Sequence, residues 1–110
     1  MIIGIGCDIV KNDRLKNKEE NFINLVLSKD EIIIYNSKIG KQKTQFLAGR
    51  FCAKEAIIKA LPPKDTLAMA KINIYYKDEK PMCIINDYKI HLSISHEDEY
   101  SVAYVIIEKD

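Results

Sequence analysis

Apolar and polar residues alternate along residues 2–10, the first patterned stretch of the chain. Isoleucine and cysteine fill one set of alternate positions, and the other set holds Gly4, Gly6 and Asp8. A period of two is typical of a β-strand. Because glycine carries no side chain, another backbone or a ligand can approach this face of the strand closely. Asp8 either faces the backbone or ligand that approaches this face, or it turns the chain where the strand ends.

The longest apolar segment, residues 46–61, predicts a helix that is buried on several sides, because its apolar positions go nearly all the way round. Residues 20–27 form a shorter amphipathic segment. Ser28, with Glu31 three residues later, is a capping box and predicts a second helix. We expect Gly40 to end that second helix, with the polar residues after it leading into the long one.

Four charges interrupt the long helix and fall on two strips. Glu55 and Lys59 share one strip, and Arg50 and Lys54 share another, about 140° away around the axis. Charged groups on a largely buried helix need partners. These residues are therefore either structural ion pairs or the wall of a site, with a carboxylate for a metal and bases for an anion.

The second half of the chain changes to the period of strands, separated by short turns. The expected strands are residues 71–76, 82–85, 90–96 and 101–107. Short connections predict an antiparallel meander. The fold class is therefore α+β: a mainly antiparallel sheet of about five strands packed on the long central helix. A length of 110 residues fits one domain, residues 1–110.

Composition narrows the functional classes. The net charge of +1 gives no overall field that would favour nucleic acid. No apolar run approaches 18 residues, and the first residues lack the basic region and cleavage site of a signal peptide, so we expect neither a membrane span nor secretion. Cys7, Cys52 and Cys83 are odd in number and lie in apolar runs, which predicts buried thiols in a reducing cytoplasm. Residues 11–18 carry a local excess of basic side chains, either as a solvated loop or as a docking surface for an acidic partner.

The candidate site residues together indicate phosphate chemistry. Asp8 and Glu55 have no Cys or His ligand motif near them, which suits Mg²⁺ better than zinc. Basic side chains around a bound Mg²⁺ can take further phosphate oxygens, and Ser95–His96 at a strand end adds a third polar cluster. The set is that of a phosphoryl-transfer or pyrophosphate-binding site.

Three segments carry a resemblance to a known family. Residues 4–14 (GIGCDIVKNDR) resemble the pattern G-I-G-x-D-I-V-x-x-x-R. Residues 46–60 (FLAGRFCAKEAIIKA) resemble a family pattern that begins with F and ends in R-F-x-x-K-E-A-x-x-K-A. Residues 91–96 (HLSISH) resemble H-h-S-h-S-H, where h is apolar. In this order, and over nearly the whole chain, these motifs resemble the holo-[acyl-carrier-protein] synthases, the small bacterial 4′-phosphopantetheinyl transferases.

The resemblance implies transfer of the 4′-phosphopantetheine arm of coenzyme A to a serine of apo acyl carrier protein, in fatty acid biosynthesis. It implies that Asp8 and Glu55 hold Mg²⁺ and, with Lys59, are catalytic. The substrate-binding residues it implies are Arg50, Lys54, Ser95 and His96. It places the carrier protein against Arg14 and Lys11, and it implies a cytoplasmic homotrimer with sites between subunits.

Two other functional classes stay open from the residues. A non-catalytic oligomeric module could use the basic segment to bind an acidic partner, and a Mg²⁺-dependent hydrolase could cleave a nucleotide pyrophosphate. The base that accepts the serine proton is either a metal-bound water or a carboxylate. The three acidic residues 97–99 depart from the family pattern and place negative charge beside the expected phosphate site, unless their side chains turn outward.

Overall fold

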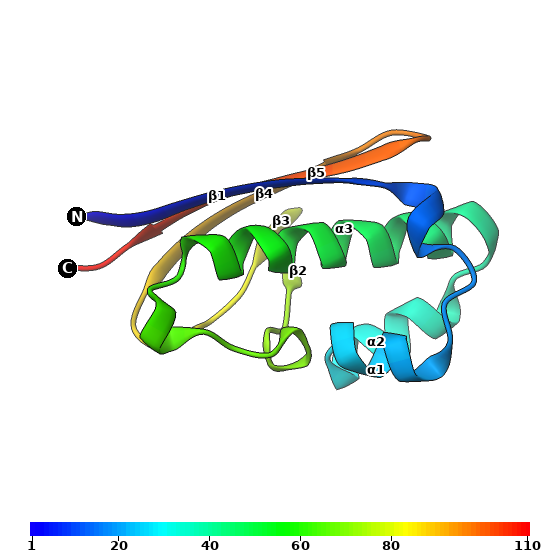
Figure 1. Ribbon diagram of the computed structural model, residues 1–110, viewed down its shortest axis with the longest axis horizontal. Coiled ribbons are helices and arrows are strands. Elements are labelled where there is room, and N and C mark those ends of the chain that lie inside the picture. The colour runs from blue at the N-terminus through cyan, green and yellow to red at the C-terminus, as the bar shows by residue number, and fades with distance from the viewer.

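The computed structural model describes all residues 1–110 and shows the long helix α3 lying between a sheet and a layer of shorter elements (Figure 1). The helices are α1 (Glu20–Val26), α2 (Lys29–Ser37) and α3 (Gly40–Ala60), with 3₁₀ turns η1 (Asn12–Leu15), η2 (Pro63–Asp65) and η3 (Met69–Lys71). The strands are β1 (Ile2–Lys11), β2 (Tyr75–Lys77), β3 (Lys80–Met82), β4 (Lys89–His96) and β5 (Tyr100–Glu108). No helix combines the length and apolar character needed to cross a membrane.

The main sheet has the order β1-β5-β4, with both pairs antiparallel. β5 is therefore the central strand, and its inward-facing Ala103, Val105 and Ile107 are buried against α3. The chain ends lie side by side at one end of the sheet, where Met1 and Lys109 exchange main-chain hydrogen bonds (Figure 1). β2 and β3 form a separate two-stranded sheet.

β1 packs on α3 backbone to backbone, through its two glycines. A Cβ atom added to Gly4 would lie 1.8 Å from the carbonyl oxygen of Ala60, and one added to Gly6 would lie 2.0 Å from that of Ala56. No side chain fits in that space. The predicted close approach to the glycine face is thus confirmed, and the approaching backbone is that of the long helix.

The opposite face of the sheet carries apolar side chains that point to solvent. In the register of β1 with β5, Ile5 is opposite Ile106 and Cys7 is opposite Tyr104. Ile5 is 72% exposed and Tyr104 58% exposed, and Ile9 continues the row at 63%. We call this surface, formed by Ile3, Ile5, Cys7, Ile9, Tyr104 and Ile106, the outer apolar face. An apolar surface of this kind commonly marks a protein–protein contact.

The helical layer on the other side of α3 contains the predicted capping box. Ser28 accepts a hydrogen bond from the Glu31 backbone N–H, and the Glu31 carboxylate accepts one from the Ser28 N–H. Unlike most capping residues, Glu31 is fully buried. Its remaining acceptor capacity is therefore used inside the protein, by the Lys54 ammonium and the Ile74 N–H.

The α+β class, with an antiparallel sheet on a long helix, is confirmed, but the five strands form two sheets instead of one. Gly40 begins α3, with a φ of +58°, where it was expected to end the preceding helix; α3 therefore starts six residues before Phe46. The polar residues 41–45 contain no helix breaker, so the helix extends through them.

The strand expected at residues 71–76 is shorter than predicted, because only Tyr75–Lys77 pairs as β2. The backbone N–H of Ile74 donates instead to the Glu31 carboxylate, so it is not available to a neighbouring strand. The expectation of three buried thiols was also wrong for one of them: Cys52 and Cys83 are buried, but Cys7 lies on the outer apolar face.

Candidate active site

The acidic residue of β1 lies beside the Glu55–Lys59 strip of α3. Lys59 Nζ is 3.2 Å from Asp8 Oδ1 and also donates to the carbonyl oxygen of Cys7 at 3.1 Å. The Asp8 side chain is only 18% exposed, whereas that of Lys59 is 54% exposed. Glu55 is half-buried one helical turn before Lys59. The close packing of Gly6 on Ala56 brings the two segments together, so residues 47 positions apart in the sequence share one edge of the molecule.

The donor set at this edge suits a hard cation. Asp8 and Glu55 offer carboxylate oxygens, which Mg²⁺ prefers, and Mg²⁺ is usually held by one or two carboxylates with water and phosphate completing its coordination. No group of three or more His, Cys, Asp and Glu side chains is clustered as a metal cage. The two carboxylates fit a metal that is shared with a phosphate-containing substrate.

Cys52 supports Asp8 in a way that the sequence pattern did not indicate. Its buried thiol lies 3.0 Å from the carbonyl oxygen of Asp8 and 3.5 Å from that of Ser101, to which it can donate. Burial, together with the nearby Asp8 carboxylate, raises the pKa of Cys52 to about 12. The thiol therefore stays protonated and links β1 and β5 to the helix at the residue that carries the carboxylate.

The other charged strip of α3 faces the helical layer and meets Glu31. Lys54 is fully buried, and its ammonium donates to the Glu31 carboxylate, to Val26 O at 2.7 Å and to Met69 O at 2.9 Å. All three N–H groups are used, and burial lowers the pKa of Lys54 while Glu31 opposes that change. The family resemblance implies that Lys54 binds substrate, and that role stays a prediction. The structure surrounds the Lys54 ammonium with partners from α1, α2 and η3.

Arg50 is held next to the same carboxylate but lines a cavity. Its Nε lies 3.2 Å from Glu31 Oε2, and its guanidinium carbon lies 4.4 Å from the centre of the Phe46 ring and 5.1 Å from that of Tyr76. The cavity has a volume of about 470 Å³, and its lining also includes Gly49 and His96. Two residues predicted to contact phosphate, from the middle of α3 and the end of β4, thus share one hollow.

Ser95 and His96 lie at the end of β4, on different sides of it. Ser95 lines a second cavity of about 270 Å³ that reaches the outer sheet surface, and His96 lines both cavities. Of the acidic residues that follow, Asp98 pairs with Lys41 at 2.8 Å and is 80% exposed. The charge of Asp98 is thus directed to Lys41, on the first turn of α3.

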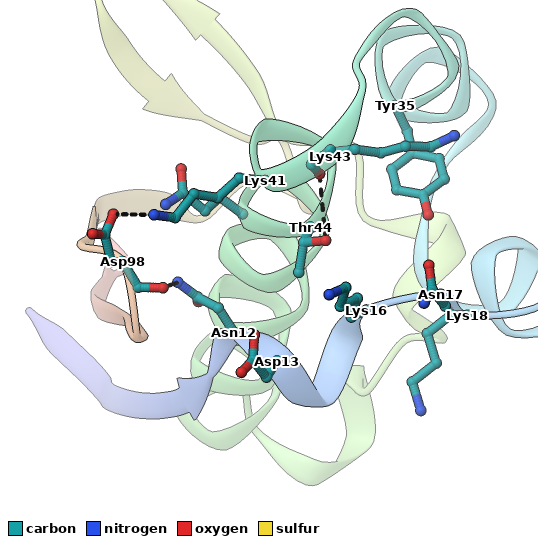
Figure 2. Close-up of a pocket in the computed structure, with 12 residues that line it drawn as sticks. Asn12, Asp13, Lys16, Asn17, Lys18, Tyr35, Lys41, Lys43, Thr44 and Asp98 are labelled. Atoms are coloured by element: carbon teal, nitrogen blue, oxygen red, sulfur yellow. Dashed lines mark hydrogen bonds and ion pairs between the residues drawn. The ribbon is translucent and has the colours of Figure 1, made fainter.

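The basic segment after β1 borders a third cavity, of about 590 Å³ (Figure 2). Lys16 and Lys18 from that segment and Lys43 from α3 all line it, while Lys41 is paired with Asp98 at the other end (Figure 2). Arg14 and Lys11 are exposed on η1 and the end of β1, within a few residues of this cavity. The sequence indicated the charges of residues 11–18 but not that α3 adds lysines to the same surface.

Comparisons with known proteins show the family to which the chain belongs. A family model of the 4′-phosphopantetheinyl transferase superfamily matches residues 4–105. The holo-[acyl-carrier-protein] synthase of Mycoplasma mycoides subsp. mycoides SC is 45% identical over 111 residues, covering 100% of this chain and 98% of that protein. The holo-[acyl-carrier-protein] synthase of Geobacillus sp. (strain WCH70) is 43% identical over 117 residues, covering 99% and 98%.

A solved structure shares the fold over its whole length. The holo-(acyl-carrier-protein) synthase from Bacillus anthracis str. Ames, solved in complex with CoA (3′,5′-ADP), superposes with a TM-score of 0.89 at 34% identity, covering 100% of this chain and 99% of that chain. The chain therefore belongs to the holo-[acyl-carrier-protein] synthase family of 4′-phosphopantetheinyl transferases, and it is an enzyme of the transferase class.

Proposed function

We propose that residues 1–110 form one domain that transfers the 4′-phosphopantetheine arm of coenzyme A to a serine of apo acyl carrier protein in a Mg²⁺-dependent reaction. The other product is adenosine 3′,5′-bisphosphate, and the holo carrier serves fatty acid biosynthesis in the cytoplasm. One observation carries the proposal: Asp8 is brought to the strip of α3 that holds Glu55 and Lys59. The names of the relatives and the coenzyme A complex of the Bacillus anthracis protein support the choice of substrates.

The reaction is a displacement at phosphorus. The serine oxygen forms a bond to the phosphorus that carries the pantetheine arm, and the bond from that phosphorus to the bridging oxygen breaks. The serine proton passes to a base, either a water molecule or a carboxylate. Asp8 and Glu55 would hold Mg²⁺, which would supply positive charge to the phosphates of the substrate. Lys59 is exposed enough to reach a bound phosphate and would balance the charge that develops on the leaving group.

The nucleotide would be held by the Arg50–His96 cavity. A guanidinium matches a phosphate with two parallel hydrogen bonds, and the rings of Phe46 and Tyr76 keep the guanidinium plane in place. His96 lines the same hollow, and Ser95 precedes it on β4. This cavity would bind a phosphate of the nucleotide, while the Asp8 edge would bind the pyrophosphate.

The acyl carrier protein would dock on the basic surface around Arg14 and Lys11. The lysines that border the neighbouring cavity extend the positive surface on which an acidic partner would be steered and held. Reversing Arg14 to Glu is therefore expected to weaken carrier binding much more than coenzyme A binding. Equal losses for the two substrates would refute the docking role.

The active unit would be a homotrimer with sites between subunits. Arg50 and Glu55 lie about 140° apart around α3, so the two halves of the proposed site face different directions in one chain. The outer apolar face supplies a surface for a second copy, and it adjoins both Asp8 on β1 and Ser95 on β4. Pairing of two copies there would join the metal half of one chain to the nucleotide half of another.

The proposal is tested by mixing the protein, coenzyme A, Mg²⁺ and an apo carrier, and following the intact mass of the carrier. We expect a gain of one phosphopantetheine with the wild type and none with Asp8→Ala or Glu55→Gln, both of which should stay folded. Glu79→Gln, at the exposed β2–β3 turn, is the matched control and should keep full activity. Wild-type transfer by both site variants would refute the metal assignment. Release of phosphate-containing products without carrier modification would favour a hydrolase. The absence of any reaction would favour a non-catalytic binding module.

Sites between subunits give a second test. Asp8→Asn and Arg50→Gln chains should each be inactive, and mixing them under conditions of subunit exchange should restore activity. Each working site needs one chain of each kind, so random mixing is expected to restore about one quarter of the wild-type rate. No recovery, in mixtures shown to exchange subunits, would refute the shared site.

A further inference from the structure

Glu31 is the one buried carboxylate in the molecule, and it has no role in the proposed reaction. Glu31 belongs to the capping box of α2, yet it is fully buried and contacts three groups besides the cap of its own helix. Its Oε1 accepts from the Ser28 N–H and the Lys54 ammonium, and its Oε2 accepts from the Ile74 N–H and faces Arg50 Nε. A helix cap needs only the first of these contacts.

Arg50 has only an incomplete set of internal partners. Its side chain is 8% exposed, and its Nε is the one buried side-chain nitrogen or oxygen that lacks an aligned hydrogen-bond acceptor. At 3.2 Å from Glu31 Oε2 it is close enough for an ion pair but out of line for a hydrogen bond. The guanidinium is therefore held on one edge by charge and on its face by the Phe46 and Tyr76 rings.

Lys54 explains why Glu31 is needed at this place. Arg50 and Lys54 are one helical turn apart, so two positive charges lie side by side in the core. Without an anion between them, they would repel each other, and Arg50, which lines the open cavity, is the one that could move away. Glu31 pairs with both and leaves one net positive charge at the wall of the cavity.

We propose that Glu31 is a positioning residue for nucleotide recognition: it anchors the Nε edge of Arg50 so that the rest of the guanidinium is fixed toward an anionic phosphate in the Arg50–His96 cavity. This inference rests on the proposed function, since it takes the phosphate to be that of the coenzyme A nucleotide. Pre-orientation of a guanidinium lowers the ordering cost of binding and thus raises affinity for that phosphate alone.

The decisive comparison uses two nucleotides that differ by one phosphate. Binding of adenosine 3′,5′-bisphosphate and of adenosine 5′-monophosphate is measured by calorimetry for the wild type, Glu31→Gln and Glu31→Asp. We expect Glu31→Gln to weaken the bisphosphate by about tenfold and the monophosphate by less than about twofold. Glu31→Asp keeps the negative charge but moves it back from Arg50. This variant should fold at least as readily as Glu31→Gln. It should lose less affinity for the bisphosphate, and again lose little affinity for the monophosphate.

Ser28→Ala is the matched control for stability. It removes the other half of the capping box but leaves the Glu31 carboxylate opposite Arg50, so it should lower the unfolding midpoint without changing either affinity by more than about twofold. In an Arg50→Gln background, Glu31→Gln should cause no further loss of affinity for the bisphosphate, because Glu31 acts through Arg50. The positioning role would be overturned if Glu31→Gln weakened binding of both nucleotides equally. It would also be overturned if Glu31→Gln reduced the affinity for the bisphosphate as much in the Arg50→Gln background as in the wild type.

A spectroscopic measurement needs no loss of the carboxylate. The chain has two arginines, Arg14 and Arg50, so their Nε–H signals in a ¹⁵N spectrum are readily told apart. The Arg50 proton should exchange slowly with solvent in the wild type and faster in Glu31→Asp, with the exposed Arg14 as internal reference. Unchanged exchange would refute the anchoring. A wild type that binds no bisphosphate would overturn the proposed function as well, whereas tight binding that Glu31→Gln leaves unchanged would overturn only this inference.

Discussion

Replacing Gly6 by alanine should force β1 away from α3, and the size of the effect can be worked out from the packing. The added Cβ would lie 2.0 Å from the carbonyl oxygen of Ala56, whereas ordinary contact begins at 3.4 Å, so the strand and helix must separate by about 1.4 Å. Both groups are fixed to backbone, so neither can rotate away. Overpacking of a core costs about 1–3 kcal/mol where side chains can adjust, and we expect about 3 kcal/mol or more here.

The assay is urea unfolding followed by circular dichroism. With a denaturant slope of about 1–3 kcal/mol per molar for a protein of this size, Gly6→Ala should lower the midpoint by about 1–3 M. Transfer activity should fall further than the folded fraction does, because Asp8 lies two residues along the displaced strand. The displacement would move its carboxylate relative to Lys59 and Glu55.

Gly49→Ala is the control with the opposite expected sign. Its Cβ would meet only Ile94 Cγ2, at 3.5 Å, which is an ordinary contact. Alanine in a helix interior is more favourable than glycine by about 1 kcal/mol, so the midpoint should rise. If Gly6→Ala unfolded at the wild-type midpoint, the backbone contact between β1 and α3 would not be what positions Asp8.

Three further outcomes follow from the same structure. Burial raises the pKa of the Cys52 thiol from 9.0 to about 12, so the thiol ionises at lower pH in the unfolded chain than in the folded protein. The free energy of unfolding should therefore fall between about pH 9 and pH 12. Urea titrations at a series of pH values should show a smaller fall for Cys52→Ala. Ile5→Glu should leave the chain folded but dissociate the assembly in sedimentation and speed up alkylation of Cys7; an unchanged mass would refute assembly through the outer apolar face. Lys54→Met should cost about 3–5 kcal/mol by leaving Glu31 buried and unpaired, whereas Lys59→Met, which breaks an exposed pair, should cost less than about 1 kcal/mol.

The sequence predicted the elements of the fold whose signals are local. Alternation in residues 2–10, the Ser28–Glu31 capping box and the apolar segment after Phe46 all correspond to observed elements, because each depends on neighbours within one or two turns. The early start of α3 at Gly40 is a local feature that the apolar pattern missed, because the polar residues 41–45 continue the helix without contributing to its apolar surface. The short β2 was missed for a different reason: it depends on a tertiary contact, the Ile74 N–H bonding to Glu31, that no local pattern reports.

The candidate site was predictable to a similar degree. The strips on the helix wheel correctly separated Arg50 and Lys54 from Glu55 and Lys59, but a wheel cannot say which charges are internal. Lys54 is enclosed because its ammonium donates to Val26 O and Met69 O, which belong to segments distant from it in the sequence. Glu31 was read only as a helix cap, since nothing in its own segment indicates that Arg50 lies across from it.

The enclosure of Lys54 makes it a built-in reporter of opening events. Amine-directed reagents react with the neutral amine form of exposed lysines, and Lys54 has no accessible surface while α1, α2 and η3 stay in place around it. The fraction of Lys54 that becomes acylated over time would therefore count how often the helical layer detaches from α3. That frequency can be compared with global unfolding without adding any label to the protein beforehand.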